Sequence, residues 1–134
     1  MPLVRIDLAQ GRTDEEVRAV ADAIHGAIVE VDGIPARDRF QVINELPAGR
    51  IIAEDAGLGF ERTDGVVVIQ IFTQRGRSVD TKAALYRAIA DSLGTVGVTG
   101  ENVFIGYVEN GPQDWSFGFG AAQYLTGELG VPAF

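Results

Sequence analysis

Apolar residues recur with a period of two at the start of the chain and with a helical period directly afterwards. The alternation over residues 3–8 predicts a strand with two distinct faces. Thr13 and Glu16 form a capping-box sequence ahead of apolar positions spaced for one helix face, and Gly33 ends that helix. A second strand is predicted at about residues 39–45. The first half of the chain therefore reads as a β-α-β unit.

The second half of the chain repeats this order of elements. Residues 65–73 form a nearly continuous apolar run rich in β-branched side chains, which predicts a strand buried on both faces. A helix is predicted from the N-cap Ser78 to Gly94, and another strand follows at residues 102–110. The pattern thus predicts a second β-α-β unit.

The spacing of these elements indicates an internal repeat within one domain. Predicted strand starts at positions 3 and 66 lie 63 residues apart, and helix caps at positions 13 and 78 lie 65 apart. We expect a single domain over residues 1–134, with repeats of about 2–62 and 65–134 building an α/β (α+β) fold around a four-stranded sheet. Right-handed crossovers place both helices on one sheet face. The other face stays apolar and bare, which predicts a homo-oligomer.

The last segment, residues 114–130, differs from both repeats. Its sequence DWSFGFGAAQYLTGELG contains four aromatic residues interspersed with four glycines. This composition is incompatible with a long regular helix and predicts a short hairpin or extended arm that places aromatic rings.

Composition narrows the classes of function. Nineteen acidic and eleven basic residues give a net charge of −8, which repels phosphate backbones and argues against nucleic-acid binding. Cysteine is absent and His25 is the single histidine, which excludes zinc–thiolate sites, cysteine nucleophiles and multi-histidine metal sites. No apolar run is long enough to span a membrane, and the start of the chain lacks a signal-peptide pattern. We expect a cytoplasmic protein without a metal or other cofactor.

Pro2 directly follows the start methionine. Removal of that methionine would expose a secondary amine, which can act as a base, an acid or an imine-forming nucleophile. Many proteins without such chemistry also begin Met-Pro, so the dipeptide alone leaves both interpretations open.

Two groups of charged residues are candidates for binding an anion. Arg75 and Arg77 lie between a predicted strand and the helix that follows it. Ligands bind at such junctions, and arginine side chains bind carboxylates bidentately. Asp38 lies between Arg37 and Arg39 just before the second strand. Taken singly, each group is also compatible with a solvated loop.

These features together resemble the malonate semialdehyde decarboxylase family of the tautomerase superfamily. The resemblance rests on PLVRIDL, GRTDEE, IPARDRFQ, EDAGLGF, TQRGRS and VENGPQDWSFGFG running into YLTGEL, and it covers almost the whole chain. It implies a homotrimer of fused β-α-β units, in agreement with the repeat and the bare sheet face.

The resemblance also implies roles for individual residues. The catalytic amine would be that of Pro2, assisted by Asp38, with Arg75 and Arg77 binding the substrate carboxylate. A hydrophobic wall maps to four residues, one of them a tyrosine where the family has phenylalanine: Trp115, Phe117, Tyr124 and Leu129. The implied reaction is decarboxylation of malonate semialdehyde or a similar 3-oxo acid, with hydration of acetylenic or unsaturated acids as a side activity.

Two other functions stay open at this point. A neutral Pro2 acting as a base would make the protein an isomerase that moves a proton between carbons of an enol or a 2-oxo acid. A trimer without catalysis would be a binding module. The protonation state of Pro2 separates the two enzymes, because the decarboxylase needs a cationic or iminium-forming amine.

Overall fold

The alternating residues at the start of the chain form strand β1 (Leu3–Ala9). In the computed structural model of the chain, which describes residues 2–130, the side chains of Val4, Ile6 and Leu8 are buried on one face of a sheet. The other strands are β2 (Phe40–Leu46), β3 (Val67–Gln74) and β4 (Val103–Asn110). All four predicted strands are present, each with bounds within two residues of the expected ones.

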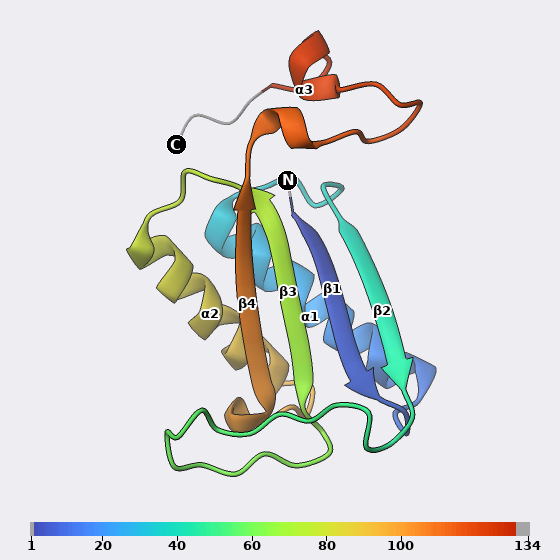
Figure 1. The fold of residues 1–134 in the computed structure, drawn as a ribbon, viewed down its shortest axis with the longest axis vertical. Coiled ribbons are helices and arrows are strands. Elements are labelled where there is room, and N and C mark those ends of the chain that lie inside the picture. The colour runs from blue at the N-terminus through green and yellow to red at the C-terminus, as the bar shows by residue number, and fades with distance from the viewer. Residues whose placement is uncertain (1, 131–134) are drawn as a thin grey trace.

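The strands are ordered β2-β1-β3-β4 in one sheet (Figure 1). Strand β1 pairs in parallel with β2, β3 pairs in parallel with β4, and the central pair β1 and β3 is antiparallel. Each parallel pair is connected through one long helix, as two β-α-β units require. This arrangement confirms the predicted four-stranded sheet with two helices.

The helices begin and end at the residues that the sequence indicates. Helix α1 (Asp14–Asp32) starts with a complete capping box between Thr13 and Glu16 and ends at Gly33, whose φ of 67° is left-handed. In helix α2 (Val79–Gly94), the Ser78 hydroxyl accepts the N–H of Thr81. These local signals determine where each helix meets the sheet.

Both helices pack against the same face of the sheet (Figure 1). Their inward side chains, such as Ile24 of α1 and Ile89 of α2, are fully buried against the inner residues of the central strands. Burying an aliphatic side chain of this size contributes about 1.5–3 kcal/mol. The core therefore lies between the helices and the sheet, and the strand ends that carry the candidate residues are attached to it.

The opposite face of the sheet is uncovered by helices, but it is apolar only in part, because the register also places Arg5, Asp7 and Gln70 on it. The strand register lines up Phe40, Leu3, Phe72 and Val108 in one row across this face. Phe40 is 39% exposed and Val108 is 47% exposed, values that are unusual for large apolar side chains on a sheet. We call this surface, with Val42, Val68 and Phe104, the outer face.

The C-terminal arm differs in part from its predicted form. It contains two short helices, η2 (Pro112–Asp114) and α3 (Gln123–Thr126), and an isolated bridge between Gly118 and Ala121 provides the only hairpin-like contact among the described residues. Glycine-rich segments accommodate such tight turns, so a four-residue helix forms between them. The arm lies beyond the strand ends, at the same end of the molecule as the N-terminus (Figure 1). Within residues 2–130, none of the helices has the length and apolar character needed to cross a bilayer.

The bare outer face leads to a prediction about self-association. We expect Phe104→Glu to reduce the mass of the assembly in solution, because a charge placed in a desolvated apolar interface is unfavourable. Val79→Glu is the matched control, since Val79 is 82% exposed at the first turn of α2, where an acidic residue is favourable. Sedimentation velocity of both variants measures the effect. Equal masses for Phe104→Glu and the unmodified protein would contradict the assignment of this face.

Candidate active site

Pro2 is buried directly before β1. Leu3 pairs with Phe40 on β2 and with Phe72 on β3. Continuing this register by one residue places Pro2 beside Thr73, which is 1% exposed at the end of β3. Met1 lies outside the described residues. The candidate amine therefore sits at the edge of the sheet where β1 and β2 begin and β3 and β4 end.

Asp38 lies in the turn between α1 and β2, next to this edge. The turn is held by the Asp38 N–H, which donates to the Pro35 carbonyl at 2.9 Å, and by a 2.8 Å contact between His25 Nε2 and the Ala36 carbonyl. Burial raises the pKa of Asp38, while the nearby positive charges of His25 and Arg77 act in the opposite direction. The aspartate predicted from the sequence is thus a partly buried carboxyl in a fixed turn.

The two predicted arginines lie in different surroundings. Arg75 is exposed, and its main-chain N–H donates to the Asn110 carbonyl at 2.8 Å. The Arg77 side chain is only 5% exposed, and its Nε lies 3.2 Å from Oδ2 of Asp32, which is 4% exposed. Arg77 Nη1 also donates to the Thr73 hydroxyl at 3.3 Å. Arg75 can reach a ligand from solvent, whereas Arg77 faces the site from the protein interior.

The aromatic residues of the arm gather into one cluster at the same edge. The rings of Trp115 and Phe117 are stacked with centroids 5.8 Å apart, and Tyr124 meets Phe117 edge-on at 5.4 Å. Trp115 Nε1 donates to Asn110 Oδ1 at 2.8 Å, which orients the indole. Leu129 is joined to the arm through its N–H, which donates to the Gln123 carbonyl.

The sequence did not single out Phe40, which extends this cluster from the sheet. Its ring lies 5.6 Å from that of Phe117. A hollow of about 390 Å³ adjoins these two rings and is also lined by Leu3, Asp114, Trp115 and Ser116. Two of the four predicted wall residues, Trp115 and Phe117, thus border a space that is open to a small ligand.

Gln74 is the second residue that sequence reasoning missed. It is 2% exposed, and its Nε2 forms no hydrogen bond of normal length and angle among residues 2–130. Burial and then the negative charge of Asp38 raise the pKa of the Tyr124 phenol, and the side chain of Gln74 lowers it. Gln74, Asp38 and Tyr124 therefore lie within interaction range of one another. The only sequence signal was its place directly before Arg75, where a polar residue is usually solvated.

A further unsatisfied polar atom lies near Arg77. In the described part of the chain, Asp32 Oδ1 is also buried without a hydrogen-bond partner, and the buried Tyr107 hydroxyl lies against the Arg77 guanidinium. Burial raises the pKa of Tyr107, and the adjacent Arg77 lowers it. Folded proteins leave few buried polar atoms unsatisfied. Their concentration at one edge of this sheet marks it as the candidate site.

Comparison with known proteins identifies the family. The family described as tautomerase enzyme matches residues 38–118, and a second family with the same description matches residues 2–61. The chain is 40% identical to "Probable tautomerase YrdN" of Bacillus subtilis (strain 168), over 96% of this chain and 100% of that protein. The chain belongs to the tautomerase family.

Solved structures of tautomerase relatives are also similar to this chain. FG41 malonate semialdehyde decarboxylase inhibited by 3-bromopropiolate is 57% identical, with a TM-score of 0.95 over 97% of this chain and 99% of that chain. A fused 4-OT wild-type asymmetric trimer is 25% identical, with a TM-score of 0.73 over 92% of this chain and 98% of that chain. The tautomerase fold therefore extends over nearly the whole of this chain.

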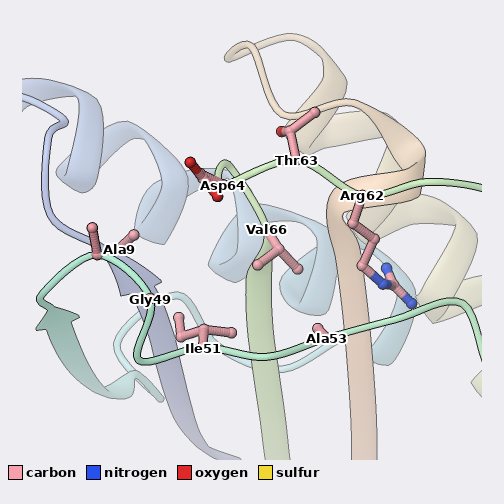
Figure 2. Close-up of a pocket in the computed structure, with 9 residues that line it drawn as sticks. Ala9, Gly49, Ile51, Ala53, Arg62, Thr63, Asp64 and Val66 are labelled. Carbon is pink, nitrogen blue, oxygen red and sulfur yellow. The ribbon is translucent and has the colours of Figure 1, made fainter.

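A second cavity in this tautomerase lies at the opposite end of the sheet (Figure 2). Its volume is about 150 Å³, and it contains none of the predicted site residues. The Arg62 side chain on its wall is held by the main-chain carbonyls of Glu54 and Glu101. Among residues 2–130, no three His, Asp or Glu side chains gather closely enough to hold a metal ion. The chemistry-bearing groups are thus concentrated at the Pro2 edge.

The raised pKa of Asp38 leads to a prediction about stability. The folded chain binds a proton at this carboxyl more tightly than the unfolded chain, so stability falls as the pH rises from about 3.9 through the folded pKa. The Asp38→Asn variant has no carboxyl to titrate at this position, so it does not lose this stability. The difference between its Tm and that of the unmodified protein should therefore rise between about pH 4 and pH 7. Thermal unfolding monitored by circular dichroism measures the difference.

Asp55 provides a control of opposite sign. Main-chain N–H groups of Gly57 and Gly59 donate to its carboxylate, and these bonds lower the pKa of Asp55. The Tm of Asp55→Asn relative to the unmodified protein should therefore fall as the pH rises from the lowered folded pKa to the unfolded value of about 3.9, and should change little above that range. A fall for Asp38→Asn as well would show that the Asp38 carboxyl is stabilised rather than penalised in the folded state.

Proposed function

We propose that this tautomerase decarboxylates malonate semialdehyde or a similar 3-oxo acid, with Pro2 as the catalytic amine. The observation that carries the proposal is the buried polar cluster beside Pro2, in a chain 57% identical to a malonate semialdehyde decarboxylase. Met1 must be removed first, because an amide nitrogen at Pro2 would be neither basic nor nucleophilic.

The reaction requires an electron sink next to the carboxylate. When the bond to CO2 breaks, its electron pair moves toward the 3-oxo carbonyl and an enol or enolate forms. A cationic Pro2 amine would stabilise that oxygen by donating a hydrogen bond. Alternatively, Pro2 would condense with the carbonyl, with loss of water, to an iminium that accepts the electron pair and is later hydrolysed. In both cases a proton added at carbon completes acetaldehyde.

Three groups would bind the substrate carboxylate. Arg75 is exposed at the strand end and would supply charge-assisted hydrogen bonds. Gln74 would offer its buried Nε2 donor, and Arg77, whose charge is balanced by Asp32, would contribute guanidinium N–H donors from behind. These groups would hold the carboxylate so that its bond to the neighbouring carbon is perpendicular to the carbonyl plane. In that geometry the electrons of the breaking bond can move into the carbonyl.

The aromatic cluster would favour decarboxylation by destabilising the charged carboxylate of the bound substrate. Trp115, Phe117 and Tyr124 form an apolar wall, joined at its end by Leu129. A carboxylate against such a wall is poorly solvated, whereas the transition state spreads its charge. The Asp38 carboxylate would stabilise the cationic amine or position the substrate or a water molecule. The hydration of acetylenic acids expected from the resemblance would use the same residues.

We expect the unmodified protein, with Met1 removal verified by mass spectrometry, to convert malonate semialdehyde to acetaldehyde. Proton NMR follows this reaction directly, and it also follows phenylpyruvate and 2-oxo-3-pentynoate. Pro2→Ala should lose at least about 100-fold in kcat/KM, since it replaces the secondary amine by a primary one of different geometry. Absence of acetaldehyde beside rapid enol–keto exchange would overturn the decarboxylase in favour of an isomerase.

The isomerase is the second candidate, and the likeness to the B. subtilis probable tautomerase favours it. It would use neutral Pro2 as a base, so its rate should rise as one group deprotonates below neutral pH. A binding module without catalysis would show no turnover of any 3-oxo, 2-oxo or enol acid, and Pro2→Ala would change nothing.

A matched pair of glutamine variants tests the role of Gln74. Gln74→Met removes a buried donor that lacks a well-formed hydrogen bond, so we expect unchanged or higher thermal stability and a roughly 10- to 100-fold lower kcat/KM. The amide of Gln123, 8% exposed, accepts from the Phe117 N–H and donates to the Gly118 carbonyl, so Gln123→Met should lose stability. Steady-state kinetics and thermal unfolding measure both effects. Lower stability with unchanged kinetics in Gln74→Met would assign Gln74 a purely structural role.

We also propose that the protein is a homotrimer. The outer face carries exposed apolar side chains on each chain, and the fused 4-OT relative is a trimer. Covering these faces by one another would remove the exposed rings of Phe40 and Phe104 from water. The sedimentation experiment on Phe104→Glu also tests this assembly, because the unmodified protein should sediment with the mass of three chains.

A further inference from the structure

The ion pair between Asp32 and Arg77 is far more buried than the others that join described residues. Its two side chains are 4% and 5% exposed, whereas in the pair of Lys82 and Glu109 they are 22% and 37% exposed. Removing two charges from water costs about as much free energy as their attraction returns. Stability alone is therefore a weak explanation for this pair.

Asp32 also occupies an unfavourable position on its helix. It is the last residue of α1, where the helix dipole places partial negative charge and disfavours an acidic side chain. One of its oxygens, Oδ1, is buried without a hydrogen-bond partner among residues 2–130. The carboxylate is thus retained with an incomplete set of hydrogen bonds, and its main interaction is with the charge of Arg77.

The pair lies directly behind the predicted catalytic amine. Arg77 Nη1 donates to the Thr73 hydroxyl, and the strand register places Thr73 beside Pro2. An uncompensated guanidinium at this position would oppose a second positive charge on Pro2. A carboxylate that cancels the guanidinium charge removes that repulsion.

Other ionisable groups also face the pair. Tyr107 and Tyr124 approach Arg77 from β4 and from the arm, and Asp38 approaches it from the turn before β2. Lys82 of α2 faces Tyr107 and is paired with Glu109 of β4, and His25 of α1 faces Asp38. Asp32 contacts the Arg77 guanidinium directly, with Oδ2 3.2 Å from Nε.

We propose that Asp32 is a positioning residue that cancels the charge of Arg77 and so allows Pro2 to carry the positive charge used in decarboxylation. This inference rests on the proposed function, because it assigns a purpose to the cationic form of Pro2. Asp32 does not need to touch the substrate for this role.

The experiment follows the Pro2 amine directly. Protein labelled with ¹⁵N-proline, with Met1 removal verified by mass, is titrated by NMR as the unmodified form and as Asp32→Asn, Asp32→Glu and Glu109→Gln. We expect Asp32→Asn to lower the midpoint of Pro2 by about one pH unit, and the alkaline limb of kcat/KM to move with it. Asp32→Glu should restore the midpoint.

Glu109→Gln is the matched control. It also breaks an ion pair, but water screens the charge left on Lys82, so the Pro2 midpoint should stay where it is. An unchanged midpoint in Asp32→Asn, or an equal shift in Glu109→Gln, overturns the proposal. The NMR titration needs no turnover, so absence of decarboxylation would refute the proposed function without deciding the role of Asp32.

The ionisation state of the Asp32 carboxyl can be measured in the unmodified protein, so the proposal can be tested even if Asp32→Asn does not fold. Burial raises the pKa of Asp32 while Arg77 lowers it, and cancellation of the Arg77 charge requires the carboxyl to be ionised. NMR spectra of ¹³C-aspartate-labelled protein show whether this carboxyl is ionised. Its signal is assigned as the one that is missing in Asp32→Glu. An ionised Asp32 carboxyl at pH 7 supports the proposal, and a protonated one overturns it.

Discussion

The antiparallel pairing of β1 with β3 is the contact on which the candidate site depends. Each β-α-β unit has its own parallel pair, and only this central pairing joins the two units into one sheet. It brings the start of the chain beside the end of β3, so that Pro2 meets residues more than seventy positions away in sequence. A slip of one residue in this register would turn Pro2 and Thr73 to opposite faces.

Most of the fold follows from local signals in the sequence. The alternation around Val4 and Ile6, the capping box at Thr13 and the left-handed Gly33 specify elements that depend on nearby residues. The repeat predicted the two parallel pairs. The short helix α3 was missed, because four residues between glycines carry no periodic pattern that distinguishes a helical turn from a loop.

Pro2, Asp38 and the arginine pair were candidates from the sequence itself, and the resemblance added their roles and the aromatic wall. Pro2, Asp38 and the aromatic residues of the arm lie at one edge of the sheet, as the strand order requires. Gln74 and Asp32 were missed because their importance comes from burial, which depends on how α1, β3 and the arm pack together. A glutamine at the end of a strand and an aspartate at the end of a helix look solvated in sequence. Sequence alone also gave no reason to separate exposed Arg75 from buried Arg77.

The distribution of unsatisfied polar groups connects stability with function in this tautomerase. Gln74 Nε2 and Asp32 Oδ1 each lower the stability of the folded state, since their hydrogen bonds to water are lost without full replacement. The well-packed core between helices and sheet supplies enough free energy to tolerate them. A ligand with carboxylate and carbonyl oxygens would satisfy the Gln74 donor but would leave Asp32 in place. The two buried groups would therefore serve different purposes: Gln74 would bind the ligand, and Asp32 would balance the charge near the Pro2 amine.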